Sequence, residues 1–343
     1  MRGELSDEDQ PNATKRRDRR FVLRRNLILV LTPLVLAGVV IVGVKSMATV
    51  AGSAAPTPSA RPTSSLAPTT TTTPPPTTTT TPPSTSDDPI APDAATEAVH
   101  AADASAASGE KVSVAVLDRV TGKETDGADA STTVPCASVL KLFLITDLFH
   151  QQEQGALTLS KTDLSEIASA LTISDDSAMN TLWSKYHGQA AISQLINIAH
   201  LPDAQITSIV ASGKWGGVMI SARDVLAVYE YVLTKLSPED RDLIIGNLNH
   251  ANPVGYQGFN QAFGLLNPAT RTGTTKAKQG WSNWFGQTVL NTTGILDDHD
   301  KLVVAVLTAR PGHGTAAQYD TARGQIDDAT DALLKALGPN ATR

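Results

Sequence analysis

Ser138 and Lys141 are the residues of this 343-residue chain whose types and spacing most directly suggest chemistry. Residues three apart on a helix share one face and lie one turn from each other, so the Lys141 amine can reach the Ser138 hydroxyl. A serine activated by a neighbouring base is a nucleophile for acyl transfer through a covalent ester. In the alternative interpretation, Ser138 is a helix N-cap and Lys141 an ordinary lysine. The spacing alone leaves both interpretations open.

The same spacing occurs a second time, at Ser108 and Lys111. That copy contains a glycine and runs into an alternating apolar segment at 112–116, which predicts a turn before a strand. The copy at 138 instead runs into the apolar residues 140–149, which predict a buried helix with free backbone N–H groups at its start. Cys136 lies two residues before Ser138, but no histidine accompanies it in the sequence. Ser138 is therefore the favoured nucleophile.

The elements that must position this pair are predicted from the spacing of apolar residues. Alternating apolar segments predict strands at 112–118, 123–125, 288–296 and 301–309. Helical periodicity predicts helices at 93–107, 138–154, 161–170, 176–186, 189–198, 221–236, 238–248 and 315–337. Strands on both sides of a helical block, followed by a closing helix, favour an α+β fold in which helices pack on an antiparallel sheet.

Two further motifs follow in the chain. The segment Ser174-Asp175-Asp176-Ser177-Ala178-Met179-Asn180 comes before a predicted helix, where it also suits an N-cap and an acidic first turn. The segment Lys278-Gln279-Gly280-Trp281 comes just before the last predicted hairpin. Arg271-Thr272-Gly273 is a rival for the third motif, but it lies further from that hairpin.

These three motifs, in this order, resemble those of class A β-lactamases and penicillin-binding proteins, which combine Ser-x-x-Lys with Ser-Asp-Asn and Lys-Thr-Gly. The resemblance covers residues 96–338 and implies the α/β sandwich of the serine β-lactamase and transpeptidase fold. It implies that the catalytic residues are Ser138 as nucleophile, Lys141 as base or proton relay, and Ser174 as proton donor to the leaving nitrogen. It implies a substrate-binding set of Asp176, Lys278, Gly280 and Trp281, in which Lys278 attracts a substrate carboxylate. The backbone N–H groups of Ser138 and Trp281 would form the oxyanion hole.

The sequence departs from the family pattern in three places. Asp176 stands where the family has asparagine, and Gln279 where it has threonine or serine. A carboxylate close to a lysine raises the pKa of that lysine, so we hypothesise that Asp176 pairs with Lys141 and slows acylation. The region 201–220, where class A enzymes carry the glutamate that activates the deacylating water, contains Asp203 as its only carboxylate. The sequence therefore predicts poor or no β-lactam turnover.

The N-terminal part of the chain differs in composition. Residues 1–26 are predicted to be a basic cytoplasmic tail, 27–44 a single-pass transmembrane anchor and 45–95 a Thr/Pro-rich disordered linker. The apolar run can also be the core of a cleaved signal peptide. Residues 1–45 contain nine Lys/Arg and five Asp/Glu, a net charge of +4, so the rest of the chain carries −10 of the total −6. An acidic outer domain at 96–343 argues against a nucleic-acid partner.

Two functions remain in view. The first is an extracytoplasmic, membrane-anchored serine hydrolase that acts on cell-wall peptides, amides or esters, with a peptidoglycan-type peptide or a β-lactam-like small molecule as its partner. The second is a non-catalytic relative that keeps the fold and binds peptidoglycan or a protein partner. No cofactor is expected, and the scattered histidines show no metal-ligand spacing.

Overall fold

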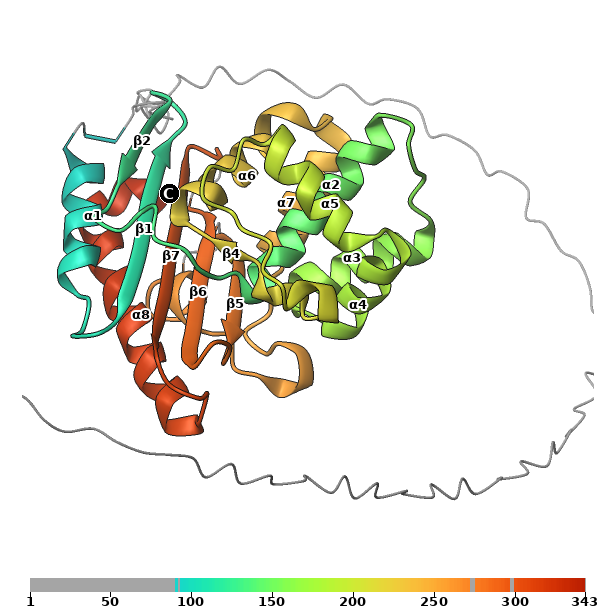
Figure 1. Cartoon of the computed structure of the whole chain (residues 1–343). Helices are drawn as coiled ribbons and strands as arrows, with labels where there is room; N and C mark the ends of the chain where they lie inside the picture. Colours follow the sequence, from blue (N-terminus) through green and yellow to red (C-terminus); the bar gives the residue numbers. More distant parts are fainter. Residues whose placement is uncertain (1–89, 92, 272–274, 297–298, 343) are drawn as a thin grey trace, which may run out of the picture. The chain divides into compact units, whose positions relative to one another are not determined.

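The computed structural model describes residues 90–91, 93–271, 275–296 and 299–342 (Figure 1). The chain divides into two units, 1–78 and 79–343, and all described residues belong to the second. The predicted basic tail and anchor, and the predicted linker up to residue 89, lie outside the described residues. None of the helices described is both long and apolar enough to cross a membrane.

A five-stranded antiparallel sheet organises the fold, with the strand order β2-β1-β7-β6-β5. Its strands are β1 Lys111–Asp118, β2 Lys123–Asp126, β5 Lys276–Ser282, β6 Gln287–Ile295 and β7 Leu302–Pro311. A second, two-stranded sheet pairs β3 Val134–Pro135 with β4 Met219–Ile220. The predicted antiparallel sheet and its last hairpin are confirmed, whereas the short strands β3 and β4 were not predicted because two residues carry no periodicity.

The helices agree closely with the predicted ranges. They are α1 Ala94–Ala104, α2 Leu140–Glu153, α3 Lys161–Thr172, α4 Asp176–Lys185, α5 Gly188–Ile198, α6 Ala222–Lys235, α7 Pro238–Asn249 and α8 Ala316–Leu337. Two short 3₁₀ helices matter for the site, η1 Ala137–Val139 and η3 Trp215–Gly217. The chain is thus an α+β protein.

The two faces of the sheet bury different sets of side chains, as strand alternation requires. Val112, Val114 and Val116 of β1 join the core with α1 and α8. Ala115 and Leu117 of the same strand join the larger core with the helical block. Figure 1 shows α1 and α8 on one side of the sheet and the block of α2 to α7 on the other. The candidate motifs lie where this block meets the edge strand β5.

Candidate active site

Ser138 and Lys141 lie together on the buried start of the α2 segment. Ser138 belongs to η1, and Lys141 is in the first turn of α2. Lys141 Nζ donates a hydrogen bond of 2.7 Å to Ser138 Oγ, and both side chains are buried. Cys136 is the N-cap residue of η1 and Val139 that of α2, so the N-cap interpretation of Ser138 is wrong. The predicted contact between the amine and the hydroxyl is present.

The backbone around η1 is held from several directions. Ala137 has a φ of +50°, a left-handed conformation that costs about 1–2 kcal/mol for a residue with a Cβ atom. Asn291 on β6 donates through Nδ2 to the backbone oxygens of Pro135 and Cys136, at 3.0 and 3.2 Å. The backbone N–H of Cys136 donates to Val218 O at 2.7 Å. These bonds over-determine the turn that presents Ser138.

Ser174 connects the two candidate lysines. It lies in the loop between α3 and α4, is fully buried, and has a left-handed φ of +59°. Its Oγ accepts hydrogen bonds from Lys278 Nζ at 2.9 Å and from Lys141 Nζ at 3.3 Å. Its backbone oxygen accepts a further bond of 2.9 Å from Lys141. The following residue, Asp175, caps α4 by accepting from two backbone N–H groups, as the sequence predicted.

Lys278 enters the site from β5, at the edge of the sheet. Its side chain is 1% exposed, and its amine donates to Ser174 Oγ and to the backbone oxygen of Gln279. Burial lowers the pKa of Lys278 well below its usual range, and the positive charge of Lys141 lowers it further. The rival Arg271 instead donates to the backbone oxygens of Asn249 and Ala251, at the end of α7. Of the two candidates for the third motif, Lys278 is therefore the one that reaches Ser174.

Gly280 lets β5 approach η1 closely. It pairs with Asn291 in the sheet, and a methyl group in its place would lie 3.0 Å from Cys136 O and 3.2 Å from Val139 N. A side chain here would push the strand away from the nucleophile. Gln279, the residue between Lys278 and Gly280, points to the other face and contacts Phe263 O. The substitution of glutamine for threonine or serine thus lies away from the two lysines.

Asp176 pairs with Lys141, as hypothesised. Lys141 Nζ lies 2.6 Å from Asp176 Oδ1, and the side chain of Asp176 is 49% exposed. The carboxylate of Asp176 raises the pKa of Lys141, as expected, but the net result is a pKa lowered to about 8. Burial of the amine lowers this pKa more than the carboxylate of Asp176 raises it. The sequence predicted the partner and the direction of its effect, but not the larger effect of burial.

Ser138 and Asp176 line a pocket of about 220 Å³. Its lining residues are Ala137, Ser138, Asp176, Asn180, Gly213, Lys214, Trp215, Gly216, Trp281 and Trp284. Three of the four tryptophans of the chain are therefore in its wall. Of the predicted binding residues, Asp176 and Trp281 line the pocket, while Lys278 and Gly280 lie behind the wall.

Trp215 and Trp284 belong to the site but were missed from the sequence. Trp215 Nε1 donates to Asn180 Oδ1 at 2.8 Å, and the ring centre lies 4.8 Å from Lys141 Nζ. A cation at this distance from an indole face is attracted by the ring. The one available signal was the concentration of tryptophan and glycine in 213–217 and 281–286.

Asp203 and Cys136, the other groups considered from the sequence, do not line the pocket. Asp203 accepts hydrogen bonds from Arg223 and Ser221 and does not line the pocket. Burial raises the pKa of the Cys136 thiol well above its usual range, which disfavours the reactive thiolate. Among the pocket residues that the structure describes, Asp176 is the only carboxylate.

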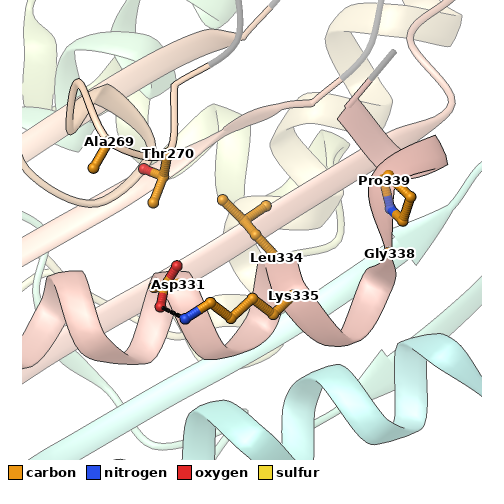
Figure 2. Close-up of a pocket in the computed structure, with 7 residues that line it drawn as sticks. All are labelled: Ala269, Thr270, Asp331, Leu334, Lys335, Gly338 and Pro339. Atoms are coloured by element: carbon orange, nitrogen blue, oxygen red, sulfur yellow. Dashed lines mark hydrogen bonds and ion pairs between the residues drawn. The ribbon is translucent and has the colours of Figure 1, made fainter.

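A second hollow, of about 340 Å³, lies at the C-terminal end of α8 (Figure 2). It is lined by Ala269, Thr270, Asp331, Leu334, Lys335, Gly338 and Pro339, and shares no residue with the Ser138 pocket. Its two charged side chains, Asp331 and Lys335, pair with each other, as Figure 2 shows. An exposed ion pair between residues one helical turn apart is common on protein surfaces and offers no nucleophile. The pocket at Ser138 is therefore the candidate active site.

Comparisons with known proteins find relatives of this chain. The family model described as "Beta-lactamase enzyme family" matches residues 160–337. The protein named "Putative lipoprotein LppW" of Mycobacterium tuberculosis (strain ATCC 25618 / H37Rv) is 30% identical over 243 residues, which cover 70% of this chain and 74% of that protein.

Solved structures share the fold. A β-lactamase from Chitinophaga pinensis DSM 2588 superposes with a TM-score of 0.52 and 17% identity, covering 71% of this chain and 99% of that chain. A representative class A β-lactamase from Bacteroides cellulosilyticus DSM 14838 gives a TM-score of 0.56 and 13% identity, with coverage of 71% and 98%.

Proposed function

The chain belongs to the β-lactamase enzyme family, and from this premise we propose that it is a serine hydrolase acting through a covalent acyl-serine intermediate. The observation that carries the proposal is the 2.7 Å hydrogen bond between Lys141 Nζ and Ser138 Oγ at the floor of the pocket. A nucleophile and a base in direct contact are the minimum needed to form an acyl-serine.

In the proposed acylation step, Ser138 Oγ forms a bond to the acyl carbon while neutral Lys141 accepts its proton at Nζ. With a pKa of about 8, Lys141 is neutral in a usable fraction of molecules near pH 7. That fraction is about one in ten, since one pH unit is a tenfold change. The backbone N–H groups of Ser138 and Trp281 are proposed to stabilise the developing oxyanion.

Ser174 is proposed to protonate the leaving group. As the bond from the acyl carbon to nitrogen or oxygen breaks, Ser174 Oγ gives its proton to the leaving atom and takes up the proton held by Lys141. The distances of 3.3 Å to Lys141 Nζ and 2.9 Å to Lys278 Nζ support this relay. Lys278 holds the hydroxyl in place, and any attraction of a substrate carboxylate acts from behind Ser174.

Deacylation is proposed to be slow. It requires a base that activates water, and the carboxylate in the pocket wall, Asp176, is paired with Lys141. Asp203 is paired with Arg223, outside the pocket lining. We therefore expect the acyl-enzyme to persist, with weak or no turnover of β-lactams.

The substrates are proposed to be cell-wall peptides or related amides and esters outside the membrane. The name of the mycobacterial relative describes a lipoprotein, which supports a place in the cell envelope. The only cysteine of this chain is Cys136, which is buried beside Ser138. We therefore assign membrane attachment to residues 27–44 rather than to a lipidated cysteine.

One observation favours a non-catalytic alternative. The ion pair with Asp176 stabilises the charged form of Lys141, which cannot accept a proton. In that case the pocket would bind peptidoglycan or a protein partner without forming a covalent bond.

Intact-mass spectrometry of the full-length protein separates the two functions. After incubation with a fluorophosphonate or a penicillin, we expect one covalent adduct on the unaltered chain and none on Ser138→Ala. An adduct that survives the substitution would place the nucleophile elsewhere. The absence of any adduct, with every acylating probe, would overturn the enzyme proposal in favour of the binding protein.

A further inference from the structure

Asp176 presents one carboxylate oxygen to the Ser138 pocket that the proposed acylation step does not use. The residue is in the first turn of α4, and its half-exposed side chain lines the pocket. Its Oδ1 accepts a hydrogen bond from Lys141 Nζ at 2.6 Å, whereas no hydrogen bond from the residues that the structure describes reaches Oδ2. An ionised carboxylate only accepts hydrogen bonds. Oδ2 therefore offers an acceptor to a group that enters the pocket.

This carboxylate lies within reach of a group bound to the nucleophile. Lys141 Nζ is 2.7 Å from Ser138 Oγ and 2.6 Å from Asp176 Oδ1, so the two oxygens are at most about 5 Å apart. An acyl group on Ser138 carries its substituents into the space that Ser138 and Asp176 both line. A substituent a few bonds from the acyl carbon can thus contact Asp176.

The charge of Asp176 is compensated by Lys141 in only one protonation state of the site. Charged Lys141 pairs with the carboxylate, but the acylation step proposed above requires neutral Lys141. Burial lowers the pKa of Lys278 well below its usual range, so Lys278 does not readily supply the missing charge. In the reactive form, Asp176 therefore loses the cation with which it pairs, and a partly buried charge without a partner is unfavourable.

The rest of the pocket wall is compatible with a positive charge beside Asp176. Three tryptophan rings line it, and an indole face attracts a cation within about 6 Å. Trp215 already lies in this way against Lys141, with 4.8 Å between the ring centre and Nζ. Lys214 is the other charged residue of the wall, but it is exposed, so water and salt screen its charge. The groups fixed around Asp176 thus favour an ammonium group over a carboxylate.

We infer that Asp176 is a specificity-determining residue, which selects acyl donors that carry an ammonium group close to the acyl carbon. The ammonium group pairs with Asp176 Oδ2 and replaces the charge that Lys141 gives up. This inference rests on the proposed function and narrows it. Among peptides, amides and esters, the preferred donors are those whose acyl part has a free amino group.

The test compares three penicillins that differ in one substituent of the acyl side chain. Ampicillin carries an α-ammonium group where benzylpenicillin carries hydrogen and carbenicillin carries a carboxylate. The rate of adduct formation on Ser138 is followed by intact-mass spectrometry of the full-length chain at about pH 6.5, below the usual α-amine pKa of about 7.7–8.0. We expect the rates to fall in the order ampicillin, benzylpenicillin, carbenicillin.

Asp176→Asn removes the charge and keeps the shape of the side chain. Differences in intrinsic reactivity among the three penicillins are the same for every variant, and a changed Lys141 pKa affects all three alike. The change in the rate ratios therefore measures the contact with Asp176. We expect the ratio of ampicillin to benzylpenicillin to fall by about fivefold in Asp176→Asn, the effect of an ion pair that is open to solvent. The ratio of benzylpenicillin to carbenicillin should fall as well.

Asp175→Asn is the matched control, because it removes the same charge from the neighbouring residue. Asp175 caps α4 with its side chain and does not line the pocket, so the variant should keep the rate ratios of the unaltered chain.

Three results would overturn the inference while the proposed function stands, provided that a fluorophosphonate labels Ser138. They are unchanged ratios in Asp176→Asn, an equal change in Asp175→Asn, and the absence of an ampicillin adduct on the unaltered chain. If neither a penicillin nor a fluorophosphonate labels Ser138 in the unaltered chain, the proposed function and this inference both fail.

Discussion

The floor and the rim of the Ser138 pocket differ in chemistry and in support. The floor is Ser138, which lines the pocket, together with Lys141, Ser174 and Lys278, which lie buried behind it; hydrogen bonds join each of the four to another. The rim consists of Trp215, Trp281 and Trp284, which are half-buried and mostly held by packing. The floor carries groups that can transfer protons, whereas the rim carries indole rings that can only exclude or orient parts of a substrate.

This contrast indicates where a change of residue should alter the acylation rate and where it should alter substrate selectivity. Polar groups in a buried network depend on one another, so removing one leaves its neighbours without partners. Aromatic walls contribute area and shape, so their replacement changes which group fits. Changes in the floor should therefore affect all substrates alike, and changes in the rim should affect substrates by size.

The largest effect is expected in the floor, from Lys278→Met. Ser174 loses the donor that holds it, and the acylation rate should fall by about 10²–10⁴-fold for every ester. The same change removes an amine whose burial disfavours its charged form, so the thermal midpoint should rise. Each kcal/mol gained corresponds to about 2–4 °C in a domain of this size. Intact-mass kinetics and thermal unfolding measure the two effects.

Lys276→Met is the matched control for this prediction. Lys276 lies two residues earlier on the same strand, and its amine pairs with Asp300 at 2.8 Å. Its replacement leaves Asp300 without that partner, so it should lower the thermal midpoint and leave acylation nearly unchanged. If Lys278→Met lowers the thermal midpoint as much as Lys276→Met does, or acylates at the rate of the unaltered chain, Lys278 does not hold Ser174 for acylation as proposed.

Much of the floor could be predicted from the sequence, because its geometry is largely local. Ser138 and Lys141 are one turn apart. Lys278 comes just before the β6–β7 hairpin in the chain, so the predicted hairpin places it on the neighbouring strand β5. The direction of the net pKa shift of Lys141 could not be predicted, because it depends on burial by residues far apart in sequence. Local charge alone suggested the opposite direction.

The rim could not be predicted for a related reason. Trp215 and Trp284 lie in connecting segments without helical or strand periodicity. Their meeting depends on Gly216 being close to Trp284 and on the arrangement of the helical block against the sheet. Only the folded chain brings these segments together.

A smaller effect is expected at Asp176, where the floor meets the rim. Lys141 has a pKa of about 8, so its neutral fraction rises with pH up to that value. The acylation rate of the unaltered chain should therefore rise with pH and level off above about pH 8. Asp176→Asn removes the carboxylate that raises this pKa, so the midpoint should shift to lower pH. A shift of one unit would raise the neutral fraction of Lys141 at pH 7 from about one in eleven to about one half, an increase of about fivefold in the acylation rate.

The pH profile of acylation by a fluorescent penicillin measures this shift. Asp175→Asn is the companion variant, because the charge of Asp175 raises the pKa of Lys141 less than that of Asp176 does. It should move the midpoint in the same direction by a smaller amount. An acylation rate at pH 7 that stays the same or falls in Asp176→Asn would show that the ion pair does not slow the reaction.

The smallest effect is expected in the rim, from Trp215→Phe. The phenyl ring keeps an aromatic face near Lys141, while the hydrogen bond to Asn180 is lost. A bond of this kind contributes about 1 kcal/mol, so acylation should slow by about fivefold or less. Asn180→Ala removes the same bond from the other side and should have a similar effect. Since both variants break one interaction, the double variant should be no slower than either, and fully additive losses would show that the two residues act independently.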